Sequence, residues 1–177
     1  VCEVKDGSML AKVKIRISLS DSEIQLFYEA RKCISPQTAY EEIREEKIRL
    51  CCFGQKDYPR KLADIPGAPL ILYYKGRLPD SDEISVAVIG SRSCSEYGRV
   101  IAEEFGRQFA EAGIQVISGM ARGIDGISQK SAVKADGYSA AILGCGVDIC
   151  YPSDNGQLYE KLEETGAIIS EYPPGTQ

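Results

Sequence analysis

From residue 84 onward, short apolar runs alternate with longer amphipathic stretches along the chain. Four runs predict strands that are buried on both faces of a sheet, at 86–89, 114–117, 140–143 and 167–169. Three helices are predicted between them, at 93–112, 126–135 and 154–165. Alternation of strands and helices indicates β-α-β units, and therefore an α/β fold with a mostly parallel sheet and helices on both faces.

The helix predicted over 93–112 has the clearest local signals. Ser93 and Glu96 have the spacing of a capping box, and Gly113 marks the end of the helix. Its expected buried stripe consists of Ile101, Phe105, Phe109 and Ala112. The helix over 154–165 is expected to begin at a capping Asp154 and to end at Gly166.

The first half of the chain has a less regular pattern. Alternation over 13–19 predicts a half-buried strand, and helices are predicted over 21–34 and 36–47, the second with Ser35 as its cap. Two apolar strands follow at 48–53 and 70–74. The polar stretch 75–82 suggests a boundary near residue 80. We therefore expect a helical and mixed N-terminal segment over 1–80 and an α/β core over 81–177.

Composition narrows the class of protein. The chain has 177 residues, of which 44% are hydrophobic and 27% charged, as in a globular domain. No run approaches the roughly 20 apolar residues of a membrane span, and no export signal opens the sequence. The absence of histidine excludes Ser-His-Asp hydrolysis and histidine-ligated zinc. Seven cysteines without a Cys-x-x-Cys pair favour reduced thiols, no metal and a cytoplasmic location.

Charge is distributed unevenly. Residues 84–134 contain six basic and five acidic side chains, whereas residues 135–177 contain one basic and seven acidic ones. The positive charge of the second half therefore lies almost wholly in its first fifty residues.

Three glycine-bearing loops are expected at the carboxyl ends of the parallel strands, where ligands bind in such folds. Backbone amides, serine hydroxyls and a guanidinium at a helix N-terminus suit a phosphate. The candidate residues are Gly90, Ser91, Arg92, Ser118, Gly119, Arg122, Gly123, Lys130, Gly144 and Gly146. Each glycine is equally well explained by a tight turn, but Arg92 is disfavoured beside a helix N-terminus unless an anion joins it. Tyr97 suits either base stacking or packing.

The familiar nucleotide signatures are missing. Neither G-x-G-x-x-G nor a P-loop follows any predicted strand, and no nucleophile elbow or pair of carboxylates flanks the loops. A phosphate-binding edge without catalytic groups or a cofactor predicts a non-enzymatic protein that binds a nucleic-acid backbone.

Five ordered motifs resemble those of the DNA processing protein A family, also called Smf. They are DYPRKLADIPGAPLILYYKG, VIGSRSCSEYG, SGMARGID, LGCGVDICYPSDN and IISEYPPG. The resemblance implies a Rossmann-like fold, binding of single-stranded DNA, loading of the RecA recombinase during transformation or recombination, and a homodimer. It implies that Arg92 is the main phosphate contact and that Lys130 or Lys134 adds a backbone contact. Asp125 is expected to hold the second loop as a helix cap.

The chain differs from the family pattern in two places. Ser128-Gln129 stands where the family has Ala-His, and the sequence stops at Gln177, before the family's Phe-x-x-Arg-Asn-Arg segment. Two alternatives stay open: a nucleotide-binding or nucleotide-hydrolysing enzyme related to the phosphoribohydrolases, whose Pro-Gly-Gly-x-Gly-Thr-x-x-Glu loop is absent here, and an interaction module that uses its acidic region.

Overall fold

The computed structural model describes residues 20–33 and 35–177, so the strand predicted over 13–19 lies outside the described residues. The chain divides into two units, residues 1–42 and 43–177. Two helices, α2 (Asp21–Cys33) and α3 (Pro36–Glu45), confirm those expected from the sequence. The hydroxyl of Ser35 accepts the amide N–H of Thr38 at 3.3 Å, as a helix cap does.

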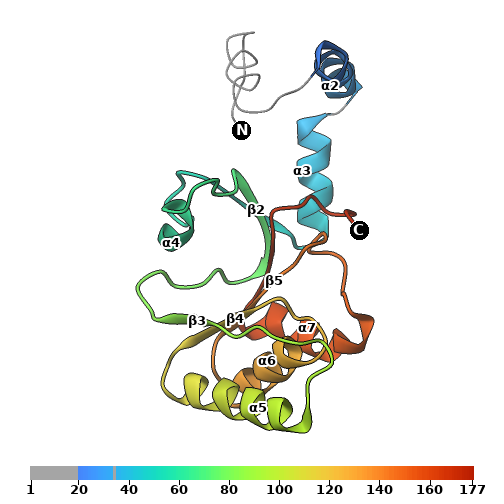
Figure 1. The fold of residues 1–177 in the computed structure, drawn as a ribbon. Coiled ribbons are helices and arrows are strands. Elements are labelled where there is room, and N and C mark those ends of the chain that lie inside the picture. Colours follow the sequence, from blue (N-terminus) through green and yellow to red (C-terminus); the bar gives the residue numbers. More distant parts are fainter. Residues whose placement is uncertain (1–19, 34) are drawn as a thin grey trace. The chain divides into compact units, whose positions relative to one another are not determined.

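The second unit contains a six-stranded mixed sheet, whose strands lie in the order β1-β2-β6-β5-β4-β3 (Figure 1). Strands β3 to β6 are parallel, and β2 runs antiparallel to both β1 and β6. The six strands are β1 (Arg49–Cys52), β2 (Ile71–Gly76), β3 (Ser85–Ala87), β4 (Gln115–Ser118), β5 (Ser139–Ile142) and β6 (Ala167–Ser170). All six were predicted to within a few residues. The division at residues 42 and 43 differs from the boundary expected near residue 80, because β1 and β2 continue the sheet of the later strands.

Helices α5 (Glu96–Glu111), α6 (Ile124–Lys134) and α7 (Gly156–Thr165) lie together on one side of the sheet (Figure 1). Side chains of the four-residue helix α4 (Arg60–Ala63) pack with the opposite face. The expected α/β class, with a mostly parallel sheet and helices on both faces, is confirmed.

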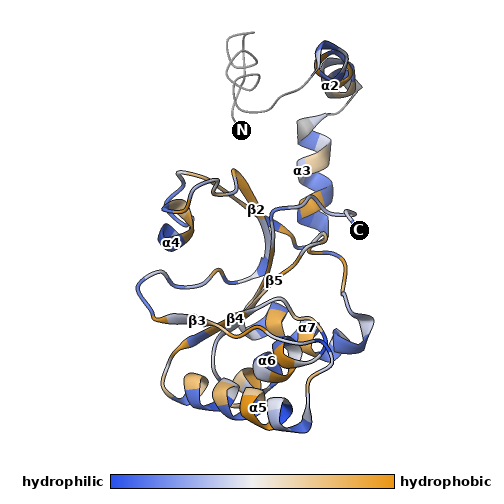
Figure 2. Cartoon of the chain, in the orientation of Figure 1, coloured by the Kyte–Doolittle hydropathy of each residue, from blue (hydrophilic) through white to orange (hydrophobic). Residues whose placement is uncertain are grey.

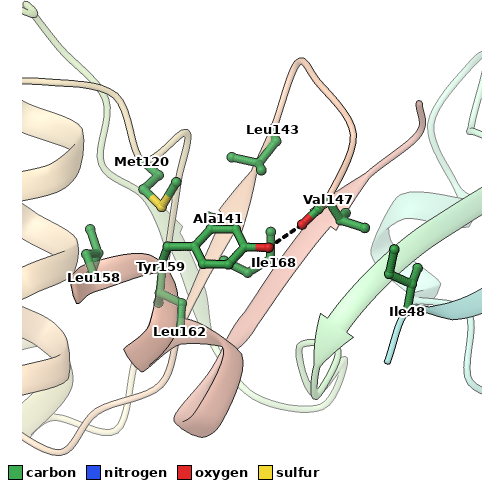
Figure 3. Packing of buried hydrophobic residues seen from close by; sticks show 9 residues of the cluster. All are labelled: Ile48, Met120, Ala141, Leu143, Val147, Leu158, Tyr159, Leu162 and Ile168. Carbon is green, nitrogen blue, oxygen red and sulfur yellow. Dashed lines mark hydrogen bonds between the residues drawn. The ribbon is translucent and has the colours of Figure 1, made fainter. Parts of the chain in front are cut away.

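Two apolar clusters fill the space between these layers. On the side of α7, Met120, Leu162 and Ile168 are fully buried, and the Tyr159 hydroxyl donates to the Val147 carbonyl (Figure 3). On the other face, Cys51, Leu72 and Ile169 pack with Leu62 and Ala63 of α4. Ile168 and Ile169 belong to different clusters because successive strand residues point to opposite faces.

The start of α5 differs from its prediction. The N-cap is Ser95, which accepts the amide N–H of Gly98 at 3.1 Å, rather than Ser93. The amide of Ser93 is instead turned toward the Ser91 hydroxyl at 3.2 Å, within the preceding loop.

The stripe predicted to be buried on α5 is also wrong. Phe105 is 46% exposed and Ala112 is exposed, whereas Ala102 and Gly106 are buried. A Cβ on Gly106 would collide with the Ser128 carbonyl of α6, so α5 and α6 approach through small residues. Both hydrophobic and hydrophilic residues occur along α5 (Figure 2).

The start of α7 is likewise different. A 3-10 turn, Ser153–Asn155, precedes the helix, and Asn155 stands at the N-cap position without a capping side-chain bond. Asp154 does not cap the helix; its carboxylate pairs with Arg122.

Neither a membrane span nor a metal cluster is found in the part of the chain that the structure describes. None of its helices has the length and apolar character needed to cross a bilayer. No group of three or more His, Cys, Asp or Glu side chains there is placed to hold a metal ion.

Candidate functional site

The loops after β3 and β4 meet at the carboxyl edge of the parallel strands. Gly123 has a φ of +76°, and a Cβ there would collide with the Ser91 carbonyl and lie 2.7 Å from the Arg92 carbonyl. The amide N–H of Ile124 donates to the Ser91 carbonyl at 3.2 Å. The structure thus brings together two of the three glycine-bearing loops that the sequence predicts at the strand ends.

Asp125 joins these two loops. Its carboxylate, in a residue only 7% exposed, accepts the amide N–H of Gly90 at 3.2 Å and that of Gly119 at 3.1 Å. The N-cap of α6 is Gly123, so Asp125 holds the loops through their amides rather than as the expected helix cap. Two of the amides predicted to bind an anion are therefore already bound to the protein's own carboxylate.

The two candidate serines also have internal partners. Ser118 is buried and its hydroxyl donates to the Val88 carbonyl at 2.6 Å. The Ser91 hydroxyl donates to the Ser93 carbonyl at 2.9 Å. Because a hydroxyl carries one proton, neither serine donates to a ligand in this conformation. Both stabilise the loops.

Arg92 is the exposed cation of the first loop. Among the described residues it has no ion-pair or hydrogen-bond partner for its guanidinium, and the backbone amides of Ser91 and Arg92 donate to no other group. These amides and the guanidinium are available to an anion at this edge, as are the amides of Ala121 and Arg122 in the second loop, which donate to no other described group.

The other predicted cations are arranged differently. The Arg122 guanidinium pairs with Asp154, with Nη2 at 2.8 Å and Nε at 3.0 Å from Oδ2. Lys130 donates to the Asn155 side-chain oxygen at 2.7 Å. Lys134 is the last residue of α6, about 15 Å along the helix axis from its first residue, so the structure does not bring it to the loops.

The third loop contributes less than predicted. Gly144 is exposed, and a Cβ there would meet no atom within 4 Å. Gly146 is buried against the segment after β6, and its amide N–H donates to the Thr176 carbonyl at 2.8 Å. Gly146 therefore serves packing.

Tyr97 and Tyr151 provide exposed rings near this edge. Tyr97, in the first turn of α5, is 76% exposed, and Tyr151, in the loop after β5, is 65% exposed. Tyr73 and Tyr74 instead pack against the two core clusters, and this burial raises the pKa of each hydroxyl. The exposure of Tyr97 removes the packing role that the sequence left open.

Gln129 is a supporting residue that the sequence did not place. It is fully buried, accepts the Met120 amide N–H at 2.9 Å and donates to the Ala140 carbonyl at 3.0 Å. Met120 has a φ of +56°, so these bonds hold an unusual turn of the second loop. Gln129 thus stabilises the loop from inside, while the Ser128 hydroxyl donates to the Asp125 carbonyl within α6.

Comparisons with known proteins agree with this architecture. Residues 49–177 match the family model described as DNA recombination-mediator protein A. The protein Smf of Synechocystis sp. is 32% identical over 151 residues, which are 83% of this chain but 38% of that protein. The chain thus spans less than half the length of that relative.

Two solved structures share the fold. DNA processing protein A from Streptococcus pneumoniae has a TM-score of 0.74 and 32% identity, over 86% of this chain and 53% of that one. DNA processing protein A from Helicobacter pylori, studied for its mode of binding single-stranded DNA, has a TM-score of 0.63 and 24% identity, over 74% of this chain and 58% of that one.

Proposed function

The chain belongs to the DNA recombination-mediator protein A family, and we propose that it binds single-stranded DNA with Arg92 as its main phosphate contact. The observation that carries the proposal is the exposed Arg92 guanidinium beside two backbone amides that have no protein partner within the described ranges. A guanidinium and adjacent amides bind phosphate oxygens through charge-assisted hydrogen bonds. Such contacts position the sugar-phosphate backbone of the DNA without recognising the bases.

Tyr97 supplies a stacking surface beside that contact. Its exposed ring belongs to the first turn of the helix that follows the Arg92 loop. A base stacked on an aromatic ring gains about 1–3 kcal/mol regardless of its identity. Together, a phosphate contact and a stacking ring suit a single strand, whose bases are available, better than a duplex.

The charges of the site predict weak binding with a small dependence on salt concentration. Arg122 is neutralised by Asp154, and Glu96 lies 3.5 Å from Arg99 at the start of α5. Few cations are therefore left to neutralise phosphates. For single strands, the logarithm of the binding constant falls with the logarithm of the salt concentration by about 0.7 per neutralised phosphate, so a shallow slope is expected.

The family is described as a recombination mediator, and this description suggests a recombinase as the protein partner. We propose that the bound strand is delivered to the RecA recombinase and that the protein acts in the cytoplasm as a homodimer. The motifs shared with the family support this part.

Fluorescence anisotropy with a labelled oligo-dT strand at several salt concentrations tests the DNA contact. Arg92→Ala should weaken binding about tenfold for every sequence, the effect of losing roughly 1.4 kcal/mol of a charged contact. Lys161→Ala removes the same charge from an exposed position on α7 and should leave binding unchanged. Equal affinity of the Arg92→Ala variant and the unaltered protein would refute the proposed contact.

A further inference from the structure

A hollow lined by basic side chains lies at the end of the sheet opposite to the Arg92 loop. It has a volume of about 570 Å³, within the range of small-molecule sites, and four basic side chains line it: Arg49, Lys56, Arg60 and Arg77. Arg77 follows β2, where the Arg77 amide bonds the Gly166 carbonyl just before β6 begins. The hollow is therefore at the amino ends of the parallel strands.

Two of these guanidinium groups are held in place by aromatic rings. Arg49 lies over the Tyr74 ring at 5.0 Å from its centroid and also donates to the Gly76 carbonyl. Arg77 lies over the Tyr138 ring at 4.9 Å, while the Tyr138 hydroxyl donates to the Arg77 carbonyl at 2.6 Å. A guanidinium stacked by its face keeps in-plane N–H groups available to a ligand.

The cations outnumber the carboxylates that line the same hollow. Arg60 pairs with Asp82, but in the described part of the chain Arg49, Lys56 and Arg77 have no carboxylate within ion-pair distance. Asp57 and Asp80 are the acidic side chains of the lining. Unpaired cations around one hollow, in a chain of net charge −5, favour an anionic ligand.

Apolar groups form another part of the wall. Leu78, Pro79 and the partly buried Tyr74 lie there, and Tyr58 and Ser81 also line the hollow, so it offers a surface for a ring as well as donors for phosphate oxygens. A bare phosphate would occupy only a small part of this volume. The combination matches an organic phosphate with a ring, of the size of a mononucleotide.

We propose that this hollow binds the phosphate and base of a nucleotide. Arg49, Lys56 and Arg77 contact the phosphate oxygens, and Tyr74, Leu78 and Pro79 contact the ring. A free nucleotide and one unit of a DNA strand share this chemistry, and experiment separates the two. The site shares no residue with the DNA contact at Arg92.

Calorimetric titration of the full chain with ATP tests the site. The unaltered protein should bind ATP saturably, and Lys56→Gln and Arg77→Gln should each weaken binding about tenfold. Lys56 is exposed and makes no hydrogen bond or ion pair with any described residue, so its substitution should leave the fold intact, and melting curves check both variants. Lys161→Ala and Arg92→Ala should bind ATP like the unaltered protein.

Competition identifies the source of the nucleotide. If the site takes free nucleotides, saturating oligo-dT leaves ATP binding intact; if it takes a unit of the strand, oligo-dT displaces ATP, and Arg77→Gln also weakens oligo-dT binding. Inorganic phosphate should compete far less well than ATP. Absence of saturable ATP binding, equal affinity of the two Gln variants and the unaltered protein, or competition by phosphate as effective as that by ATP would overturn the proposal. Because Arg92→Ala affects only oligo-dT binding, failure at one site is distinguishable from failure at the other.

Discussion

Asp125 shows what a single residue contributes at the candidate DNA site. The sequence pointed to glycines and Arg92 because strand ends, glycines and an arginine beside a helix are visible in one dimension. It did not show that the Asp125 carboxylate would accept the amide N–H groups of both Gly90 and Gly119. Asp125 is 35 residues from Gly90 and 6 residues from Gly119 along the chain, so these bonds depend on the fold. The expected cradle of amides consequently loses the amides of Gly90 and Gly119.

Gly123 provides the test of this loop contact. Gly123→Ala places a methyl group against the Ser91 and Arg92 carbonyls at a φ of +76°, which L-residues other than glycine seldom adopt. We expect a loss of more than about 1 kcal/mol in the free energy of unfolding, together with weaker oligo-dT binding, because the loop that carries Arg92 must shift. Urea unfolding and anisotropy measure the two effects.

Gly144→Ala is the matched control for Gly123→Ala. It lies at the same edge of the sheet, and the added methyl group meets no atom within 4 Å. Its stability and DNA binding should stay close to those of the unaltered chain. If both alanine variants behaved alike, the close approach of the first two loops would not matter to either property.

At the scale of elements, the strands were predictable and the covered faces of helices were not. Apolar runs of three or four residues identified β4, β5 and β6 because a strand covered on both sides is mostly apolar. On α5, the spacing of Ile101, Phe105 and Phe109 correctly indicated an apolar side but not what would cover it. The neighbouring helix α6 packs instead on Ala102 and Gly106.

The packing of α5 on α6 can be tested at Gly106. Gly106→Ala should destabilise the protein by about 1–3 kcal/mol, because its methyl group would meet the backbone of Ser128, which cannot move without displacing α6. Gly98→Ala, in the same helix, brings its methyl group no closer than 3.4 Å to Cys94 and Ser95 and should cost much less. Chemical denaturation compares the two; a stabilising Gly106→Ala would contradict the close helix contact.

At the scale of the whole molecule, the apolar side of α5 continues into an exposed sheet edge. Among residues 20–33 and 35–177, β3 is the edge strand of the sheet and pairs with β4 alone. Beside it lies a hollow of about 410 Å³ lined by apolar residues of β3, α5 and α6. Ile84 is 68% exposed, Ile89 73% and Phe105 46%. An unpaired strand next to apolar surface is a site of association between chains.

We therefore expect this 177-residue chain to associate as its concentration rises, through the β3 edge. Ile89→Lys and Phe105→Asp should each shift the equilibrium toward the monomer, because each introduces a charge that association would bury. Ile89 is largely exposed and Phe105 is partly exposed, so each substitution should change the free energy of unfolding little. Sedimentation velocity over a range of concentrations measures the association, and Lys161→Ala, on α7, serves as the control for altered net charge. If both variants associated as strongly as the unaltered chain, another surface would be responsible for the association. The short β3 strand would then not pair with a second chain.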